Sequence, residues 1–153
     1  MAYAVADPFR FELLGAMVHI GVMGHEGLSD ITEMLIRGEL WKLVTGYQTY
    51  GLVGVSPLGE GPETWFADAV LEHGGKLEVF GDPAHPSPAL MREARAVHRL
   101  APGLDRTDML LSLVDELVAV WDGEPGSTVA DAVARAEARG IYVHRVWPEG
   151  SER

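Results

Sequence analysis

The sequence contains no cysteine, which excludes disulfide bonds, thiolate nucleophiles and cysteine-ligated zinc or iron–sulfur centres. Long apolar runs are also missing, since none approaches the ~20 residues that a membrane-spanning helix requires. The first apolar stretches are interrupted by Asp7, Arg10 and Glu12, unlike the continuous apolar region of a secretory signal. We therefore expect no membrane partner and a cytoplasmic location.

Basic residues are few. Lysine and arginine together number 12 against 23 acidic residues, which gives a formal net charge of −11 at pH 7. Such a charge repels nucleic-acid backbones unless basic residues gather on one face, and the one local excess is Arg92, Arg95, Arg99 and Arg106. We expect no nucleic-acid partner. The 6 histidines are scattered without metal-binding spacing, so they predict no metal site.

The rest of the composition is that of an ordinary globular protein, with 47% hydrophobic and 23% charged residues. A chain of 153 residues suffices for one domain that buries roughly 70% of its unfolded surface. We predict a single domain over 1–153, made of an N-terminal extension over 1–15, a core over 16–147 and a frayed tail over 148–153. The segment FRFELLGAM is a candidate short helix in the extension.

Apolar runs without in-and-out alternation are separated by helical segments along the chain. This pattern indicates a parallel sheet covered on both faces and wound by right-handed crossovers. The predicted fold is α/β, a Rossmann-like open doubly wound parallel sheet of about five strands in the order 3-2-1-4-5, with helices on both faces. Predicted strands cover 17–23, 50–55, 76–80, 117–121 and 141–146, and predicted helices cover 29–43, 62–73, 88–100, 105–114 and 128–139, with a proline-rich loop over 82–88.

Glycine-rich corners follow the first and fourth predicted strands, and each leads into a helix. At such corners, free backbone N–H groups and the positive end of the helix dipole bind anions. The two strands are neighbours where the predicted order reverses, which is where doubly wound folds bind ligands. The glycines could equally serve tight turns only. The candidate nucleotide- and phosphate-binding residues are Gly24, His25, Gly27, Ser29, Gly123, Gly126, Ser127 and Thr128.

The two corners and the segment between them carry a family resemblance. The segments IGVMGHEGLS (20–29), SPLGEGPETWFADAVLEHGGKLEV (56–79) and LVAVWDGEPGSTVADAV (117–133) are similar to the SLOG superfamily, which includes YpsA-like proteins and Lonely-Guy-type phosphoribohydrolases. The resemblance spans 18–146. It implies a Rossmann-like protein that binds nucleotides or nucleotide derivatives, commonly as a homodimer.

Activity follows less directly from this resemblance than fold does. Lonely-Guy-type enzymes cleave the N-glycosidic bond of nucleoside 5′-monophosphates with a Pro-Gly-Gly-x-Gly-Thr-x-x-Glu motif, which PGSTVAD (125–131) shortens, with Asp131 at the place of the catalytic Glu. The family's catalytic Arg, in Met-x-x-Arg-Lys, has no clear counterpart, because Met91 is followed by Arg92 and Arg95 at a different spacing. Glu26 stands where YpsA-like members have Arg.

Asp131 therefore has two interpretations. As a catalyst it would stabilise an oxocarbenium-like transition state or activate water. Otherwise it caps the helix or pairs with Arg135 four residues later. The nearby acidic residues Asp122 and Glu124 could bind Mg²⁺ together with a phosphate, or they could form a solvated acidic loop.

Other side chains are also ambiguous. Arg92, Arg95 and Arg99 have the spacing of one helix side over 88–100, where they could contact a phosphate of their own or a partner's site, or remain solvated. His25 could contact a ligand or lie on the surface, and His19 is expected in the core. The large aromatic residues are expected in the core or a dimer surface, with Trp121 as a candidate for stacking on a base; they are Trp41, Trp65, Phe66 and Trp121.

Three functions remain open from the sequence. The first is hydrolysis of an N-glycosidic bond in a nucleoside 5′-monophosphate, with Asp131 as the essential carboxylate. The second is a sensor or binding module that recognises a nucleotide derivative without turning it over. The third is a structural oligomer with a degenerate pocket.

Overall fold

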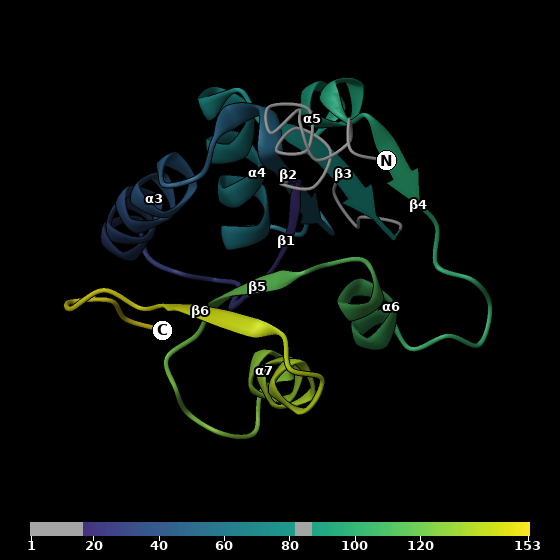
Figure 1. Ribbon diagram of the computed structural model, residues 1–153. Helices are drawn as coiled ribbons and strands as arrows, with labels where there is room; N and C mark the ends of the chain where they lie inside the picture. Colours follow the sequence, from purple (N-terminus) through teal and green to yellow (C-terminus); the bar gives the residue numbers. More distant parts are fainter. Residues whose placement is uncertain (1–16, 82–86) are drawn as a thin grey trace, which may run out of the picture.

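Apolar segments form strands and the segments between them form helices in the computed structural model, which describes residues 17–81 and 87–153 (Figure 1). The predicted N-terminal extension with its candidate helix, and most of the predicted proline loop, lie outside the described residues. The strands are β1 (Val18–Gly24), β2 (Leu52–Ser56), β3 (Lys76–Phe80), β4 (Ala96–His98), β5 (Glu116–Val120) and β6 (Tyr142–Val146). The helices are α3 (Asp30–Thr45), α4 (Pro62–His73), α5 (Pro88–Glu93), α6 (Arg106–Ser112) and α7 (Thr128–Ala138), with a 3₁₀ turn η1 (Thr49–Gly51).

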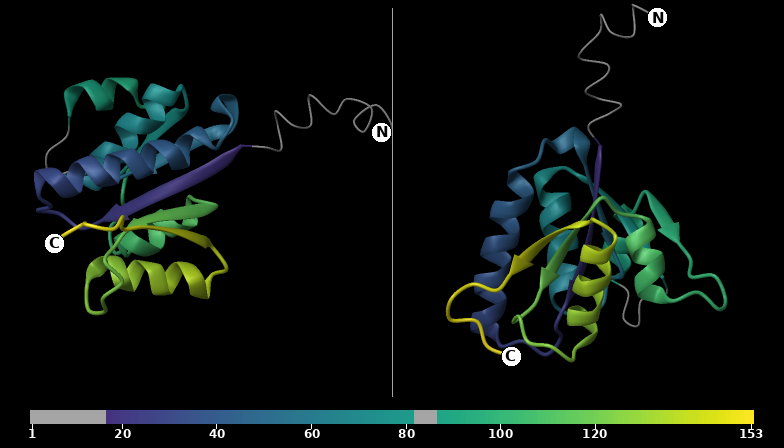
Figure 2. Two further views of the ribbon diagram at one scale, coloured as in Figure 1. Left: turned by 90° about the vertical axis from the view of Figure 1, so that its left-hand side faces the viewer. Right: turned by 60° about the horizontal axis from the view of Figure 1, so that its bottom comes forward.

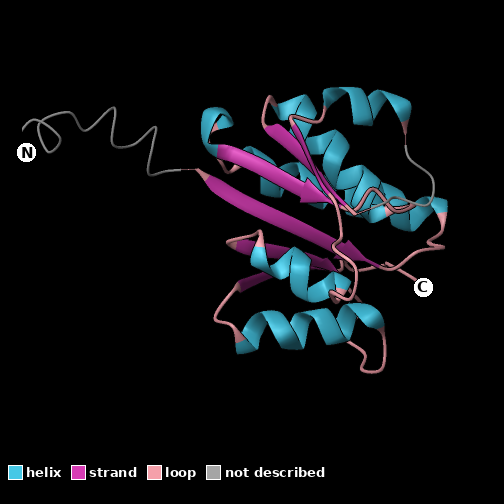
Figure 3. Cartoon of the chain, turned by 90° about the vertical axis from the view of Figure 1, so that its right-hand side faces the viewer, coloured by secondary structure: helices cyan, strands magenta, loops and turns pink. Residues whose placement is uncertain are grey.

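All the paired strands run parallel, in the order β4-β3-β2-β1-β5-β6. The predicted Rossmann-like doubly wound sheet is thus confirmed. Its predicted order is confirmed for five strands, but the sheet has a sixth, β4, at one edge. Helices α3, α4 and α5 cover one face of the sheet, and α6 and α7 cover the other (Figures 2 and 3).

The core has one layer on each side of the sheet, because the central strands are buried on both faces. On one side, Ile36 and Leu40 of α3 and Phe66 of α4 pack against β1, β2 and β5. On the other side, residues of α6 and α7 pack against β2, β3 and β5. Phe66 and Trp65 are buried as predicted, whereas Trp41 is 42% exposed on α3.

The predicted helix over 88–100 is wrong in its second half. Helix α5 ends at Glu93, and the chain then forms the short edge strand β4, which pairs with β3. The cause is Glu78 of β3, a buried carboxylate that Arg95 contacts at 2.8 Å and His98 at 2.7 Å. Burial alone would raise the pKa of Glu78, but the bonds from His98 and Arg95 lower it below its ordinary value. A buried carboxylate needs such partners, which favours the strand.

The predicted frayed tail over 148–153 is also wrong. The backbone N–H of Glu152 donates to the Thr32 hydroxyl at 2.9 Å, and that hydroxyl lies 3.2 Å from the Glu152 carbonyl oxygen. Thr32 is fully buried in α3. Arg153 reaches Asp122 Oδ2 at 3.2 Å. The tail is therefore bound between the start of α3 and the end of β5.

No helix in the described part of the chain is long and apolar enough to cross a membrane.

Candidate functional site

A cleft of about 670 Å³ lies at the carboxyl ends of β1 and β5, where the two glycine corners meet. The corners are joined directly, because the N–H of His25 donates to the carbonyl oxygen of Val120 at 3.2 Å. The walls of the cleft come from the two corners, the loop before α4, the start of α6 and the tail. The predicted meeting of the corners at the reversal of strand order is therefore confirmed.

The second corner presents the N-terminus of α7 to the cleft. Gly126, Ser127 and Thr128 line the wall, as the sequence predicted. Ser127 caps the helix, since its Oγ accepts a hydrogen bond from the Ala130 N–H at 3.0 Å. The N–H groups of Thr128 and Val129 have no acceptor within the described chain, so they remain available to an anion. Gly126 has a φ of +92°, which a side chain would strain.

The first corner contributes less than predicted. Gly24 and His25 line the cleft, but Gly27 and Ser29 do not. Ser29 instead caps α3, because its Oγ accepts from the Thr32 N–H at 3.2 Å and contacts the Thr32 hydroxyl at 3.0 Å. A Cβ at Gly24 would lie 2.6 Å from Cβ of Pro62. Glycine there lets the start of α4 approach the end of β1, so its role is close packing.

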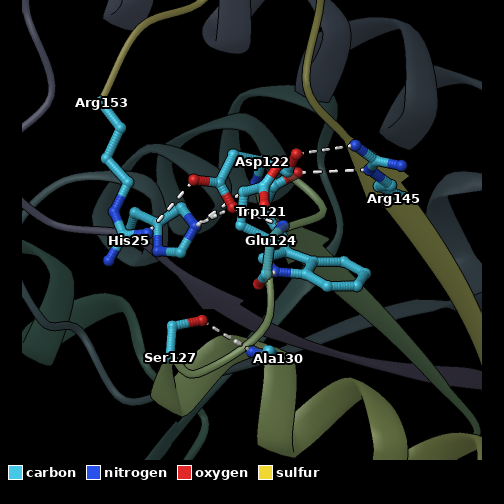
Figure 4. A network of polar contacts seen from close by, with 8 residues as sticks. All are labelled: His25, Trp121, Asp122, Glu124, Ser127, Ala130, Arg145 and Arg153. Atoms are coloured by element: carbon cyan, nitrogen blue, oxygen red, sulfur yellow. Dashed lines mark hydrogen bonds and ion pairs between the residues drawn. The ribbon is translucent and has the colours of Figure 1, made fainter.

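The His25 side chain lines the cleft and joins the two corners. The side chain is buried, with Nε2 at 3.3 Å from both the N–H and the Oδ1 of Asp122 (Figure 4). Burial, and then the charge of Arg153, lower the pKa of His25 below its ordinary value despite Asp122. The ring is therefore neutral near pH 7, and its Nε2 accepts the Asp122 N–H.

The oxygens of Asp122 are engaged by protein donors. Oδ1 accepts from the Glu124 N–H at 2.9 Å, and Oδ2 from Arg153 (Figure 4). The Glu124 N–H, followed by Arg153 and His25, lowers the pKa of Asp122. Among the described residues there is no group of three His, Asp or Glu side chains that could hold a metal. The structure therefore gives no support to a Mg²⁺ site at Asp122 and Glu124.

The remaining predicted residues of the second corner lie outside the cleft wall. Gly123, at φ +87°, packs against the Arg145 guanidinium, which donates to the Asp122 carbonyl oxygen at 2.9 Å. That guanidinium also lies over the Trp121 ring, 5.4 Å from its centroid. Trp121 thus contacts Arg145 and is not part of the cleft wall.

The structure does not bring Asp131 to the cleft. Its Oδ2 lies 2.9 Å from Nη2 of Arg135, its side chain is 53% exposed, and it is not part of the wall. The alternative interpretation, a partner four residues away on the same helix, is confirmed. Arg135 is held further by Asp105 and Asp108 of the α6 region, so the ion pairs fix this side of α7 against α6.

The three predicted phosphate-binding arginines also lie away from the cleft of their own chain. Arg95 is bound to Glu78, and β4 is three places from β1 in the sheet. Arg92 and Arg99 are not part of the cleft wall. The arginines that do line it are Arg106, at the start of α6, and Arg153, in the tail.

Glu63 is another residue of the cleft wall that the sequence did not predict. It lies in the first turn of α4, is 9% exposed, and its Oε1 accepts from the Gly59 N–H at 3.0 Å. Burial raises the pKa of Glu63 to about 7, with Glu26 adding to the rise and Arg106 and the N–H groups of Gly59 and Gly24 opposing it. A third glycine corner, LGEGPE after β2, was the available signal.

The fold is Rossmann-like. No protein-family model matches this sequence, and no curated protein matches it. Among solved structures, the molybdenum cofactor carrier protein of Chlamydomonas reinhardtii superposes with a TM-score of 0.60 at 19% identity, over 84% of this chain and 76% of that one. DNA processing protein A of Streptococcus pneumoniae gives 0.65 at 20% identity, over 91% of this chain and 53% of that one.

The corresponding protein of Helicobacter pylori, described for its single-stranded DNA binding mode, gives a TM-score of 0.59 at 11% identity over 92% of this chain and 71% of that one. These neighbours share the Rossmann-like architecture of this chain. At such identities the likeness concerns the fold alone.

Proposed function

We propose that the cleft binds a nucleotide derivative with its phosphate against the N-terminus of α7. The observation that carries this proposal is a helix start with two unpaired N–H groups, Thr128 and Val129, opening into a cleft that Arg106 and Arg153 also line. Amides and guanidinium groups are the donors that hold phosphate in proteins. A volume of about 670 Å³ falls in the usual range for small-ligand pockets.

The cleft is electrically divided, which orients such a ligand. The cations and the helix dipole lie with α6, α7 and the tail, whereas Glu26 and Glu63 lie with the first corner and α4. A phosphate placed at α7 directs the sugar and base toward the two carboxyl groups, where hydroxyl and amino groups find acceptors.

We further propose that the bound molecule is a nucleoside 5′-monophosphate whose N-glycosidic bond is hydrolysed, the activity implied by the SLOG resemblance. A phosphate anchor and carboxyl groups in one cleft are the components that this reaction needs. The same resemblance implies a homodimer, to which we extend the proposal, and we propose a cytoplasmic location because the sequence predicts no secretory signal.

A binding module without turnover is the second candidate. The observation that favours it is the location of Arg92 and Arg95, which lie beside β4 and not at the cleft. Neither arginine of the segment compared with the family's Met-x-x-Arg-Lys motif therefore lies in the cleft wall.

Ligand binding is tested with two glycine variants at opposite ends of α7. Gly126→Val strains the corner at the phosphate, whereas Gly140→Val strains a glycine at φ +74° beyond the other end of the same helix. Neither Cβ meets an atom within 4 Å, and each change costs roughly 1–2 kcal/mol of stability. By calorimetry we expect about a tenfold or greater loss of nucleoside monophosphate affinity for Gly126→Val alone.

The ligand panel includes nucleoside 5′-monophosphates, the matching nucleosides, ADP-ribose, NAD and a short single-stranded DNA. Selective binding of a phosphate-bearing nucleotide supports the proposal. Binding of the DNA but of no mononucleotide, or equal losses in both glycine variants, would reject it.

A further inference from the structure

Glu63 is the one buried carboxyl group in the cleft wall. Its backbone is fixed at the start of α4, because the Ser56 hydroxyl donates to the Glu63 carbonyl oxygen at 2.8 Å. Its carboxyl group is fixed by the Gly59 N–H. No ion pair within 4 Å joins it to an arginine of the described chain. The carboxyl group is therefore positioned by the backbone and not by an ion pair, although the charge of Arg106 opposes the rise of its pKa.

Glu26 approaches the same point from the first corner. A Cβ built at Gly59 would stand 3.5 Å from Oε1 of Glu26 and closer still to Oε1 of Glu63. The two carboxyl groups therefore converge on the Gly59 backbone from opposite elements. Glu26 is exposed, whereas Glu63 is buried, so the two carboxyl groups lie in unequal environments, an arrangement that allows two carboxyl groups to take different catalytic roles.

The other titratable groups of the cleft wall are committed elsewhere. The His25 ring is engaged with Asp122. The guanidinium groups of Arg106 and Arg153 are assigned to the phosphate. Asp131, the carboxylate that the sequence suggested, is paired with Arg135 outside the wall.

We infer that Glu63 is the proton donor, and Glu26 the carboxylate that stabilises positive charge on the sugar, in cleavage of the N-glycosidic bond of a nucleoside 5′-phosphate. This inference rests on the proposed function, because a phosphate at α7 must place the sugar between the cations and the carboxyl groups. Both glutamates are catalytic residues in this assignment. Asp131 takes no part.

The reaction balances with water as the only co-reactant. The bond between the anomeric carbon and the base nitrogen breaks, its electron pair leaves with the base, and the Glu63 carboxyl proton goes to the base. Water adds to the oxocarbenium-like carbon on the side opposite Glu26, and a water proton returns to Glu63. The products are the free base and ribose 5-phosphate.

Protonation of Glu63 near neutrality agrees with this role. Burial raises the pKa of Glu63 to about 7, so about half of the molecules carry the proton at neutral pH. A proton donor acts only in that form, so kcat/KM is expected to fall as the pH rises above about 7. A purely structural Glu63 would give no such profile.

The test measures base release by chromatography and binding by calorimetry for wild type, Glu63→Gln, Glu26→Gln and Asp131→Asn, with nucleoside 5′-monophosphates as substrates. Glu72→Gln, at an exposed position of the same helix, is the matched control. We expect Glu63→Gln to lower kcat about 10²-fold or more with affinity retained and the pH profile above 7 lost. Glu26→Gln lowers kcat as well, and Asp131→Asn and Glu72→Gln behave as wild type.

The two levels of the hypothesis fail differently. If wild type binds no mononucleotide, the proposed function is wrong and this inference falls with it. If wild type binds but releases no base, or if Glu63→Gln turns over as fast as wild type, the inference is wrong and the binding proposal stands. If turnover is lost in Asp131→Asn alone, the catalytic carboxylate is Asp131, as the sequence suggested, and the inference is wrong.

Discussion

The buried carboxyl group of Glu63 makes its own contribution to the stability of the protein decrease as the pH rises. Most acidic groups with perturbed pKa values here, such as Asp122 and Glu78, have pKa values below the ordinary value and so favour the folded state as pH rises. Glu63 does the opposite, because its folded-state pKa of about 7 lies above the ordinary 4.5. Between these values the folded protein binds more protons than the unfolded chain, so this group lowers stability as pH rises.

Replacement of Glu63 by glutamine removes this contribution. The rise of the pKa from 4.5 to about 7 corresponds to roughly 3 kcal/mol of stability, which is fully present below pH 4.5 and is lost progressively as the pH rises to about 7. We measure the free energy of unfolding with urea at pH 4.5 and pH 7. From the lower to the higher pH, we expect this free energy to fall less, or to rise more, in Glu63→Gln than in wild type. Glu72→Gln should follow wild type, and coincident curves for all three proteins would mean that Glu63 is not perturbed.

Residues that resist prediction are those whose environment is set by distant parts of the chain. The sequence around Asp131 resembles a catalytic motif, but Arg135 lies one helical turn away and forms an ion pair with Asp131. Glu63 has no local mark of burial. Its environment arises because Gly24 lets β1 and α4 approach, a contact between segments about 40 residues apart.

Elements were more predictable than individual side chains. Five of the six strands and the helices α3, α4, α6 and α7 follow from apolar periodicity and their capping residues, since each signal lies within the element itself. The strand β4 was not predicted, because Arg92, Arg95 and Arg99 have the spacing of residues on one side of a helix. The hydrogen bonds that favour the strand are made to the carboxylate of Glu78, which lies on another element, β3.

Two glycines at the element scale should respond oppositely to alanine. At Gly24 the added methyl group meets Pro62 at 2.6 Å, a rigid neighbour at the start of α4, so overpacking should cost about 1–3 kcal/mol. At Gly38, within α3, the methyl group has open space and should add up to about 1 kcal/mol of stability. Urea midpoints measure both, and equal shifts in the two variants would contradict the close approach of β1 and α4.

At the scale of the whole molecule, the tail couples the end of the described chain to its first helix and to the cleft. The Glu152 backbone is bonded to Thr32, and Arg153 joins Asp122 while lining the cleft. The cleft is thus assembled from segments of almost the full sequence. For this reason the two glycine corners alone predict only part of the cleft wall. The contribution of the tail was missed, because the tail was predicted to be frayed.

Arg153 should matter for phosphate-bearing ligands only. In Arg153→Ala we expect affinity for a nucleoside 5′-monophosphate to fall about tenfold, while affinity for the nucleoside without phosphate stays constant. Arg139→Ala, which removes a guanidinium bound to Asp108 of α6, is the control of equal charge. Similar losses for both ligands would show that Arg153 acts through the structure of the tail and not through the phosphate.

The parallel pairing of β1 with β5 has a consequence for biosynthesis. During translation β1 can join β2 early, but its other edge stays open until most of the chain has been made, because no intervening strand takes that place. Non-local parallel pairing of this kind forms slowly. The cleft is therefore completed late in synthesis, and the ligand that we propose would stabilise only chains whose two halves have already joined. A chain cut between β4 and α6 is expected to bind the proposed ligand only when its two fragments reassociate.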